Sequence, residues 1–281
     1  AGSADVKPGQ IYSILRKNEI KDKSYWSLKK KKSTLTPLVA KIPEHSNTSP
    51  SAKIKASFSF SKMDHLGFIK KKAVSSLGEI IKERDNNIMM SANDIVYIKP
   101  SGKNKLIIDR TYHIFTTSKV EEQINKNLFK GIKHLIKAQI KILEIKKSYV
   151  IGSISHAYRP VNKGDMIMEY YKRDKVLKIE NNPAPLDARL ICSVDNNLMI
   201  NDFVIAFIDA GSADVKPGQI YSILRKNEIK DKSYWSLKKK KSVSLGNLES
   251  GKLIVLHTEK IASTVMILSS KYAIHPNDMV N

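Results

Sequence analysis

The sequence predicts an all-β protein: two tandem small barrel- or sandwich-like modules with an extended N-terminal arm. From Gly78 onward the chain is a series of short apolar runs, rich in Ile, Val, Tyr and Phe and separated by turn residues. This pattern is typical of antiparallel strands that close into a barrel or a sandwich. The same order of runs then occurs a second time, as expected for two diverged copies of one module.

The repeat is carried by short motifs. Residues 79–98 read "EIIKERDNNIMMSANDIVYI" and residues 189–207 read "RLICSVDNNLMINDFVIAF". Both give an apolar pair, Asp-Asn-Asn, an apolar run, Asn-Asp and a second apolar run. Further on, "DRTYHIF" lines up with "GQIYSIL", so Tyr112 falls on Tyr221, and "KGDMI" lines up with "PNDMV". We therefore predict that the two modules share one strand order, with Tyr112 and Tyr221 on corresponding strands.

The segments outside the modules have a different composition. Residues 34–57 are rich in Ser, Thr, Pro and Lys, which indicates a linker or an extended arm. A second linker is expected around the sequence "NNPAPLDA". The predicted organisation is a linker over residues 34–65, a first β module over 66–170, a linker over 171–188 and a second β module over 189–281.

One stretch of the first module is ambiguous. Residues 118–135 read "SKVEEQINKNLFKGIKHL" and carry a Ser-x-x-Glu pattern from Ser118 to Glu121, which is a helix-capping motif. The surrounding strand runs favour a β-hairpin instead. Helix and hairpin both remain open at this point.

Residues 1–33 are a separate case, because they repeat residues 210–242 letter for letter. A recent duplication, an engineered fusion and a fragment misplaced when the chain was assembled would each explain the copy. We favour the last two, since the surrounding repeat has diverged so far. Residues 210–242 are expected to be part of the second module, with Ile220, Tyr221 and Ile223 in its barrel. The copy is expected to add to another sheet edge or to belong to a neighbouring subunit.

Composition limits the classes of function. The net charge is +22, but the basic residues are mostly Lys, whereas Arg is favoured for bidentate contacts with phosphates and bases. We therefore expect a solvated basic surface, or attraction to anionic polymers, rather than dedicated nucleic-acid recognition. The single cysteine, Cys192, excludes an intramolecular disulfide. No apolar run reaches the ~20 residues that a membrane helix needs, so no transmembrane segment is predicted.

The sequence offers no arrangement of catalytic or metal-binding residues. The seven histidines form no HxxxH, HxH or His-Cys pattern, which are the spacings that metal sites use. Phosphate-binding loops and nucleophile-elbow motifs are absent as well. We predict no catalytic dyad, no metal and no cofactor, and hence a protein that is not an enzyme.

The strongest candidate for a binding site is the sequence "SYWSLKKKKS". Aromatic residues beside a basic run can stack on sugars or bases while the lysines meet anionic groups. The alternative is a hairpin whose aromatic residues cover the core edge and whose lysines are solvated or block edge pairing. The candidate contacts for a glycan or an anionic polymer are Tyr234, Trp235, Lys238, Lys239, Lys240 and Lys241.

Several of these motifs resemble those of a known family. The stretches are "GEII…NNIMMSANDIVYI", "IIDRTYHIF", "GIKHLIKAQIKILEIKKSYVIGSI" and "VNKGDMI". They resemble the C-terminal β-repeat region of bacterial LysM-domain envelope proteins, which follows the peptidoglycan-binding LysM module. The layout is similar to the C-terminal barrel of the flagellar T-ring protein. The LysM module itself is absent, because "VKPGQIYSILRKNEI" starts like one but lacks its Asn-rich middle and its closing motif.

The resemblance implies a non-enzymatic protein of the bacterial cell envelope, in the periplasm, at the outer membrane or outside the cell. Scaffolding or adhesion at the cell wall is the implied role, with a cell-wall polymer or another envelope protein as partner. Separately, the duplicated N-terminal arm suggests self-association through an added strand. One alternative is a structural subunit of a periplasmic or extracellular assembly. The other is a basic nucleic-acid-binding protein, whose binding would weaken steeply with salt.

Overall fold

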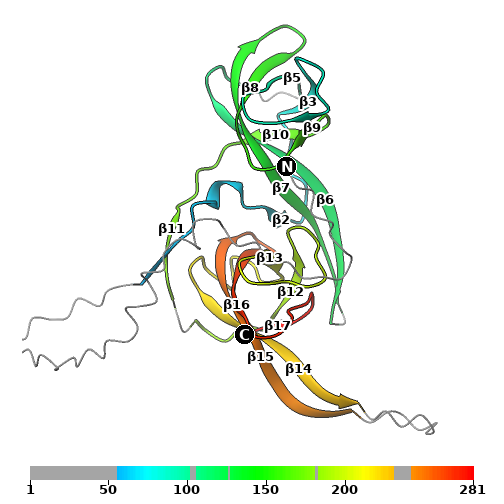
Figure 1. Cartoon of the computed structure of the whole chain (residues 1–281), viewed down its shortest axis with the longest axis vertical. Helices are drawn as coiled ribbons and strands as arrows, with labels where there is room; N and C mark the ends of the chain where they lie inside the picture. The colour runs from blue at the N-terminus through cyan, green and yellow to red at the C-terminus, as the bar shows by residue number, and fades with distance from the viewer. Residues whose placement is uncertain (1–55, 102–105, 126, 181–182, 231–241) are drawn as a thin grey trace, which may run out of the picture. The chain divides into compact units, whose positions relative to one another are not determined.

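The computed structural model describes residues 56–101, 106–125, 127–180, 183–230 and 242–281 (Figure 1). Residues 1–55, which contain the identical copy and most of the first expected linker, lie outside this range. Every element of the described part is a β-strand except one 3-10 turn, Met63–His65. The all-β prediction is therefore confirmed.

The first barrel is built from antiparallel strands in the order β7-β6-β10-β3-β5-β8, and a β7–β8 pairing closes the sheet into a ring. β2 adds to the outer edge of β7, and β4 pairs with β9 to form a small separate ribbon. The strands are β2 (Phe68–Lys70), β3 (Gly78–Glu83), β4 (Met89–Met90), β5 (Ile95–Pro100), β6 (Thr111–Ile124), β7 (Asn127–Ile145), β8 (Val150–Ala157), β9 (Val161–Asn162) and β10 (Met166–Glu169).

The second barrel is closed in the order β12-β13-β16-β15-β14-β17. An isolated antiparallel bridge between Ile200 and Ile274 takes the place of the β4–β9 ribbon. Before this barrel, β1 (Ser57–Ser59) pairs with β11 (Val176–Lys178). The barrel strands are β12 (Ala188–Ser193), β13 (Ile205–Ile208), β14 (Ile220–Lys230), β15 (Ser242–Thr258), β16 (Ser263–Ser270) and β17 (Met279–Val280).

The two rings have the same strand order, with β3, β5, β6, β7, β8 and β10 matched by β12, β13, β14, β15, β16 and β17. Tyr112 lies on β6 and Tyr221 on β14, as the sequence alignment predicts. A register shift also falls at the same place in both hairpins, directly after Ile114 in β6 and after Ile223 in β14. The predicted shared strand order is confirmed.

The repeated polar motifs form the same turns in both barrels. Asn86 and Asn196, the middle residues of the two Asp-Asn-Asn motifs, have positive φ angles of 67° and 57°, a region that Asn tolerates better than most residues. Asp165 and Asp278 each accept a hydrogen bond from the backbone N–H three residues earlier, at 2.7 and 2.9 Å. These side-chain-to-backbone bonds define the turns, as Asp and Asn do in many loops.

The ambiguous stretch 118–135 is a hairpin, formed by the outer parts of β6 and β7 around Asn125, which has a φ of 54°. Val120 and Ile124 lie on the same face of β6, and both are buried. The capping-box pattern was outweighed because these two apolar side chains pack against the second barrel. Tertiary packing commonly overrides a local preference of this size.

Candidate functional site: the junction between the two barrels

The β6–β7 hairpin is longer than the first barrel needs, and its outer part lies against the second barrel (Figure 1). Val120 and Ile124 on β6 are each only 6% exposed. They form one apolar cluster with Ile191, Cys192 and Phe207 of the second barrel. Burying such side chains stabilises a contact by roughly 1.5–3 kcal/mol each. The outer part of the β6–β7 hairpin therefore shares an apolar cluster with the second barrel.

A buried lysine forms hydrogen bonds across this contact. Lys133 on β7 is 2% exposed, and its Nζ donates to the carbonyl oxygen of Val194 at 3.0 Å and to Oδ1 of Asn196 at 2.7 Å. Burial lowers the pKa of the Lys133 ammonium, while the nearby Cys192 and Asp195 act in the opposite direction. Both acceptors belong to the turn that follows β12, so the hydrogen bonds join the hairpin to the Asp-Asn-Asn turn of the second barrel.

The strand β2 pairs with β7 and also contacts β16 of the second barrel. Thr264 Oγ1 on β16 donates to the carbonyl oxygen of Gly67 at 2.8 Å. A Cβ atom at Gly67 would lie 2.8 Å from the carbonyl oxygen of His134, so only glycine allows this approach. His134 is fully buried, stacks on Phe68 at 4.7 Å and accepts a hydrogen bond at Nε2 from the N–H of Val74. Burial lowers the pKa of His134, which keeps the ring neutral for this bond.

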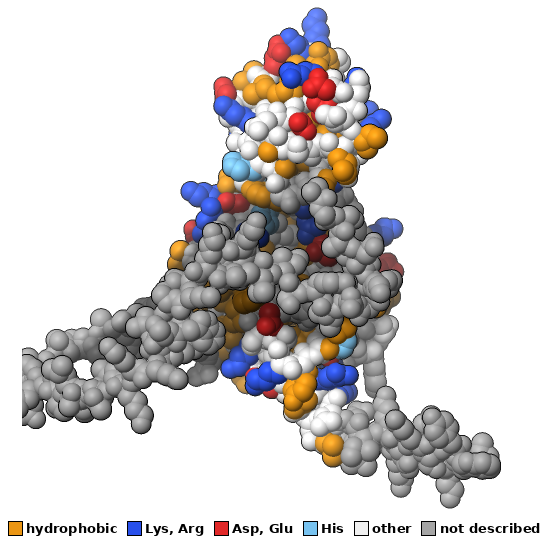
Figure 2. Space-filling view, in the orientation of Figure 1, with side chains coloured by type: hydrophobic (Ala, Val, Ile, Leu, Met, Phe, Trp, Pro, Cys, Tyr) orange, Lys and Arg blue, Asp and Glu red, His pale blue; other side chains and the backbone are white. Residues whose placement is uncertain are grey.

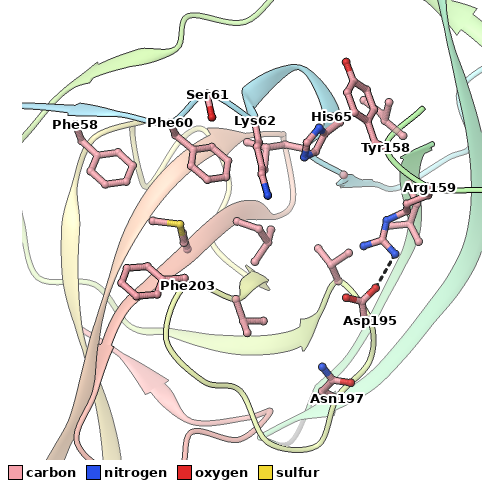
Figure 3. Close-up of a pocket in the computed structure, with 18 residues that line it drawn as sticks. Phe58, Phe60, Ser61, Lys62, His65, Tyr158, Arg159, Asp195, Asn197 and Phe203 are labelled. Atoms are coloured by element: carbon pink, nitrogen blue, oxygen red, sulfur yellow. Dashed lines mark hydrogen bonds and ion pairs between the residues drawn. The ribbon is translucent and has the colours of Figure 1, made fainter. Parts of the chain in front are cut away.

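A cavity of about 910 Å³ lies beside the junction (Figure 3). One part of its wall is apolar and comes from Phe58, Phe60 and Met266. Phe203, which has a positive φ of 62° and is 70% exposed, also borders it. A cavity of this size and lining can take an apolar or aromatic group.

The other part of the cavity wall is polar. His65 packs against Tyr158 with ring centroids 4.2 Å apart, and burial lowers the pKa of His65. Arg159 donates to Asp195 Oδ1 at 2.8 Å, which joins the end of the first barrel to the turn after β12 (Figure 3). Both side chains are half exposed, so the pair contributes at most about 1 kcal/mol. The pair forms one rim of the cavity.

The binding residues expected from the sequence, Tyr234, Trp235 and Lys238, Lys239, Lys240 and Lys241, lie outside the described residues. The structure instead brings together Lys133, Arg159 and Asp195. Asp195 lies in the turn after β12, and its motif gives no sign in the sequence that this turn also contacts the other barrel. Lys133 stands in the alternating run "GIKHLIKAQI", where a lysine is ordinarily solvated.

Within the described part of the chain, no three His, Cys, Asp or Glu side chains are close enough to hold a metal ion. Cys192 is buried in the junction, and burial raises the pKa of its thiol. On the face shown in Figure 2, Lys and Arg side chains are distributed among acidic and apolar ones rather than gathered into a stripe. The described residues form no helix long and apolar enough to cross a membrane.

The fold and the junction together define a class: an all-β protein of two tandem six-stranded barrels, the first of which covers the second with its long hairpin. A scan against protein-family models finds no match, and a search of the curated proteins finds none either.

Proposed function

We propose that this protein is a non-enzymatic structural protein of the bacterial cell envelope that acts in scaffolding or adhesion at the cell wall. The observation that carries the proposal is the hairpin junction. Apolar packing by Val120 and Ile124, together with two hydrogen bonds from Lys133, joins the barrels into one body. A scaffold needs such a fixed relation, because it holds its binding surfaces at a set distance and angle.

The envelope location is supported by the resemblance of the repeated motifs to the β-repeat region of LysM-domain envelope proteins. The partner is then a cell-wall polymer or another envelope protein. Tyr234 and Trp235 would contact sugar rings, and the lysines from Lys238 to Lys241 would meet anionic groups of the polymer. The net charge of +22 adds a long-range attraction to such polymers.

Co-sedimentation with purified peptidoglycan sacculi tests the proposal. We expect the chain to pellet with sacculi, and the double variant Y234A/W235A to bind them at least about thirtyfold more weakly, since each stacked ring contributes roughly 1–3 kcal/mol. A variant with Lys238–Lys241 changed to Ser is the matched control, because it keeps the aromatic pair and removes only charge. At low salt this variant should bind more weakly than the wild type. At high salt, where charge attraction is screened, the two should bind about equally.

A second assay, run alongside the sedimentation, separates the proposal from nucleic-acid binding. In a parallel titration with a fluorescent DNA duplex, a nucleic-acid-binding protein would bind tightly and lose affinity steeply as salt rises. Tight, salt-sensitive binding to DNA combined with no retention by sacculi would overturn the proposed function.

A further inference from the structure

The outer face of the first barrel corresponds to the covered face of the second. The correspondence follows from strand pairing. Ile81 is the extra residue at the register shift between β3 and β5. Ile191 is the extra residue at the corresponding shift between β12 and β13. Tyr97 of β5 pairs with Ile151 of β8, just as Phe207 of β13 pairs with Thr264 of β16. The matched positions are Ile81 with Ile191, Tyr97 with Phe207, and Ile151 with Thr264.

These matched positions differ in burial. In the second barrel, Ile191, Phe207 and Thr264 are all completely buried, because the β6–β7 hairpin and β2 lie on them. In the first barrel, Ile81, Tyr97 and Ile151 are only half buried. Tyr97 packs edge-on against Tyr149 at 5.6 Å, and the described part of the chain places no hairpin over this pair. The first barrel therefore has an apolar and aromatic face at the position where its twin is covered, which we call the acceptor face (Ile81, Tyr97, Tyr149 and Ile151).

The second barrel has the matching donor. The β14–β15 hairpin corresponds to β6–β7, down to the bulge after Ile223, and it projects from its barrel (Figure 1). In the second barrel, Leu248 pairs with Arg225. The corresponding pair in the first barrel is Leu135 with Thr116, so Leu248 matches Leu135. Leu135 is half buried at the junction, whereas Leu248 is 38% exposed and Leu245 is 55% exposed. We call the projecting part of β14–β15, with Leu245 and Leu248, the donor hairpin.

We propose that the donor hairpin of one molecule docks on the acceptor face of a second copy of this chain, so that the protein associates head to tail. The contact would bring Leu245 and Leu248 of the donor hairpin onto the barrel face that, in the second barrel, the β6–β7 hairpin covers within one molecule. A second copy is the occupant favoured by the structure, because the chain itself shows this hairpin type seated on this barrel face. Donor and acceptor lie on different barrels, so the contact is heterologous, and its repetition gives rings or open filaments.

This inference goes beyond the proposed cell-wall function and does not depend on it. The association is measured by sedimentation velocity on the purified chain from micromolar to submillimolar concentration. We expect assemblies larger than a dimer at the upper end. Because each copy carries a net charge of +22, added salt should strengthen self-association by screening repulsion, the reverse of its effect on binding to a polyanion.

Two variants each disable one partner surface. Tyr97→Asp places a charge on the acceptor face, and Leu248→Asp places one on the donor hairpin. Each alone should raise the dissociation constant by at least about tenfold, as loss of an interface anchor does. Ile88→Asp is the matched control, because Ile88 is 87% exposed on the first barrel and lies outside both surfaces. Thermal unfolding of all three variants checks that each of them remains folded.

Mixing the two disabled variants gives the sharpest result. Y97D keeps an intact donor hairpin and L248D keeps an intact acceptor face, so an equimolar mixture has one working interface per pair. At a concentration where each variant alone is monomeric, we expect the mixture to form dimers and nothing larger. Failure of the mixture to dimerise, or a wild-type chain that is monomeric at every concentration, would overturn the proposal. Loss of association on deleting residues 1–33 would also overturn it and assign the contact to the N-terminal copy.

Discussion

Lowering the pH is expected to destabilise this protein through a histidine inside the first barrel. His113 lies on β6, is 1% exposed and packs against Tyr170 with ring centroids 4.7 Å apart. Burial lowers the pKa of His113 from 6.5 to about 4, and the nearby Arg173 guanidinium acts in the same direction. The folded protein therefore holds this imidazole neutral at a pH where the unfolded chain already binds a proton.

The sign and size of the effect follow from this difference. The unfolded chain binds more protons than the folded one below pH 6.5, so stability that is fully present above 6.5 is lost as the pH falls toward 4. A pKa difference from 6.5 to about 4 corresponds to about 3 kcal/mol at complete protonation. By a pH of about 5, roughly 2 kcal/mol of this should already be lost.

Urea unfolding at a series of pH values between about 8 and 5 measures the loss of stability. Between these pH values, His113→Phe should lose roughly 2 kcal/mol less than the wild type. His134 and His65, whose pKa values burial also lowers, account for the remaining pH dependence in the variant. Tyr112→Phe is the matched control. It removes the acceptor for the Ile107 N–H and should cost about 1 kcal/mol at every pH. Equal pH dependence in the wild type and in His113→Phe would refute the reasoning.

Three further predictions concern buried groups. Lys137→Met should cost about 3–5 kcal/mol in urea unfolding, because it leaves Asp165 buried without the cation 2.6 Å away; the double variant K137M/D165N should regain most of this loss, and no recovery would contradict the pairing. Gly67→Ala should destabilise by roughly 1–3 kcal/mol, since its Cβ would meet the carbonyl oxygen of His134; unchanged stability would show that the strand can shift. Native Cys192 should react with a thiol reagent only as fast as the protein opens, because it is buried and its thiol pKa is raised; rapid labelling of the folded state would contradict its place in the junction.

The repeated strand order could be predicted because its signals are local. Each Asp-Asn-Asn motif encodes a turn through the tolerance of its middle Asn for a positive φ, as Asn86 and Asn196 show. The alignment of Tyr112 with Tyr221 then fixes which strands correspond. Such features depend on a few neighbouring residues, so a single sequence contains them.

The junction could not be predicted, because it depends on residues far apart in the chain. Residues 118–135 carry signals for both helix and hairpin, and the choice was made by Ile191 and Phe207, which bury Val120 and Ile124. Lys133 shows the same limit, since its acceptors lie 61 and 63 residues further along the chain. No property of a lysine within an alternating run distinguishes a buried hydrogen-bonded ammonium from a solvated one.

The repeat topology also limits what the identical copy can do. Residues 11–21 have the same sequence as β14, which in the second barrel is flanked by β15 and β17. The copy ends at residue 33 and carries neither flanking strand, and the closed ring already holds β14 between its two neighbours. The copy also lacks the second half of the donor hairpin, because Leu245 and Leu248 belong to β15. A single β14 sequence therefore supplies neither a barrel nor a complete donor, and for this reason deletion of residues 1–33 should leave head-to-tail association intact.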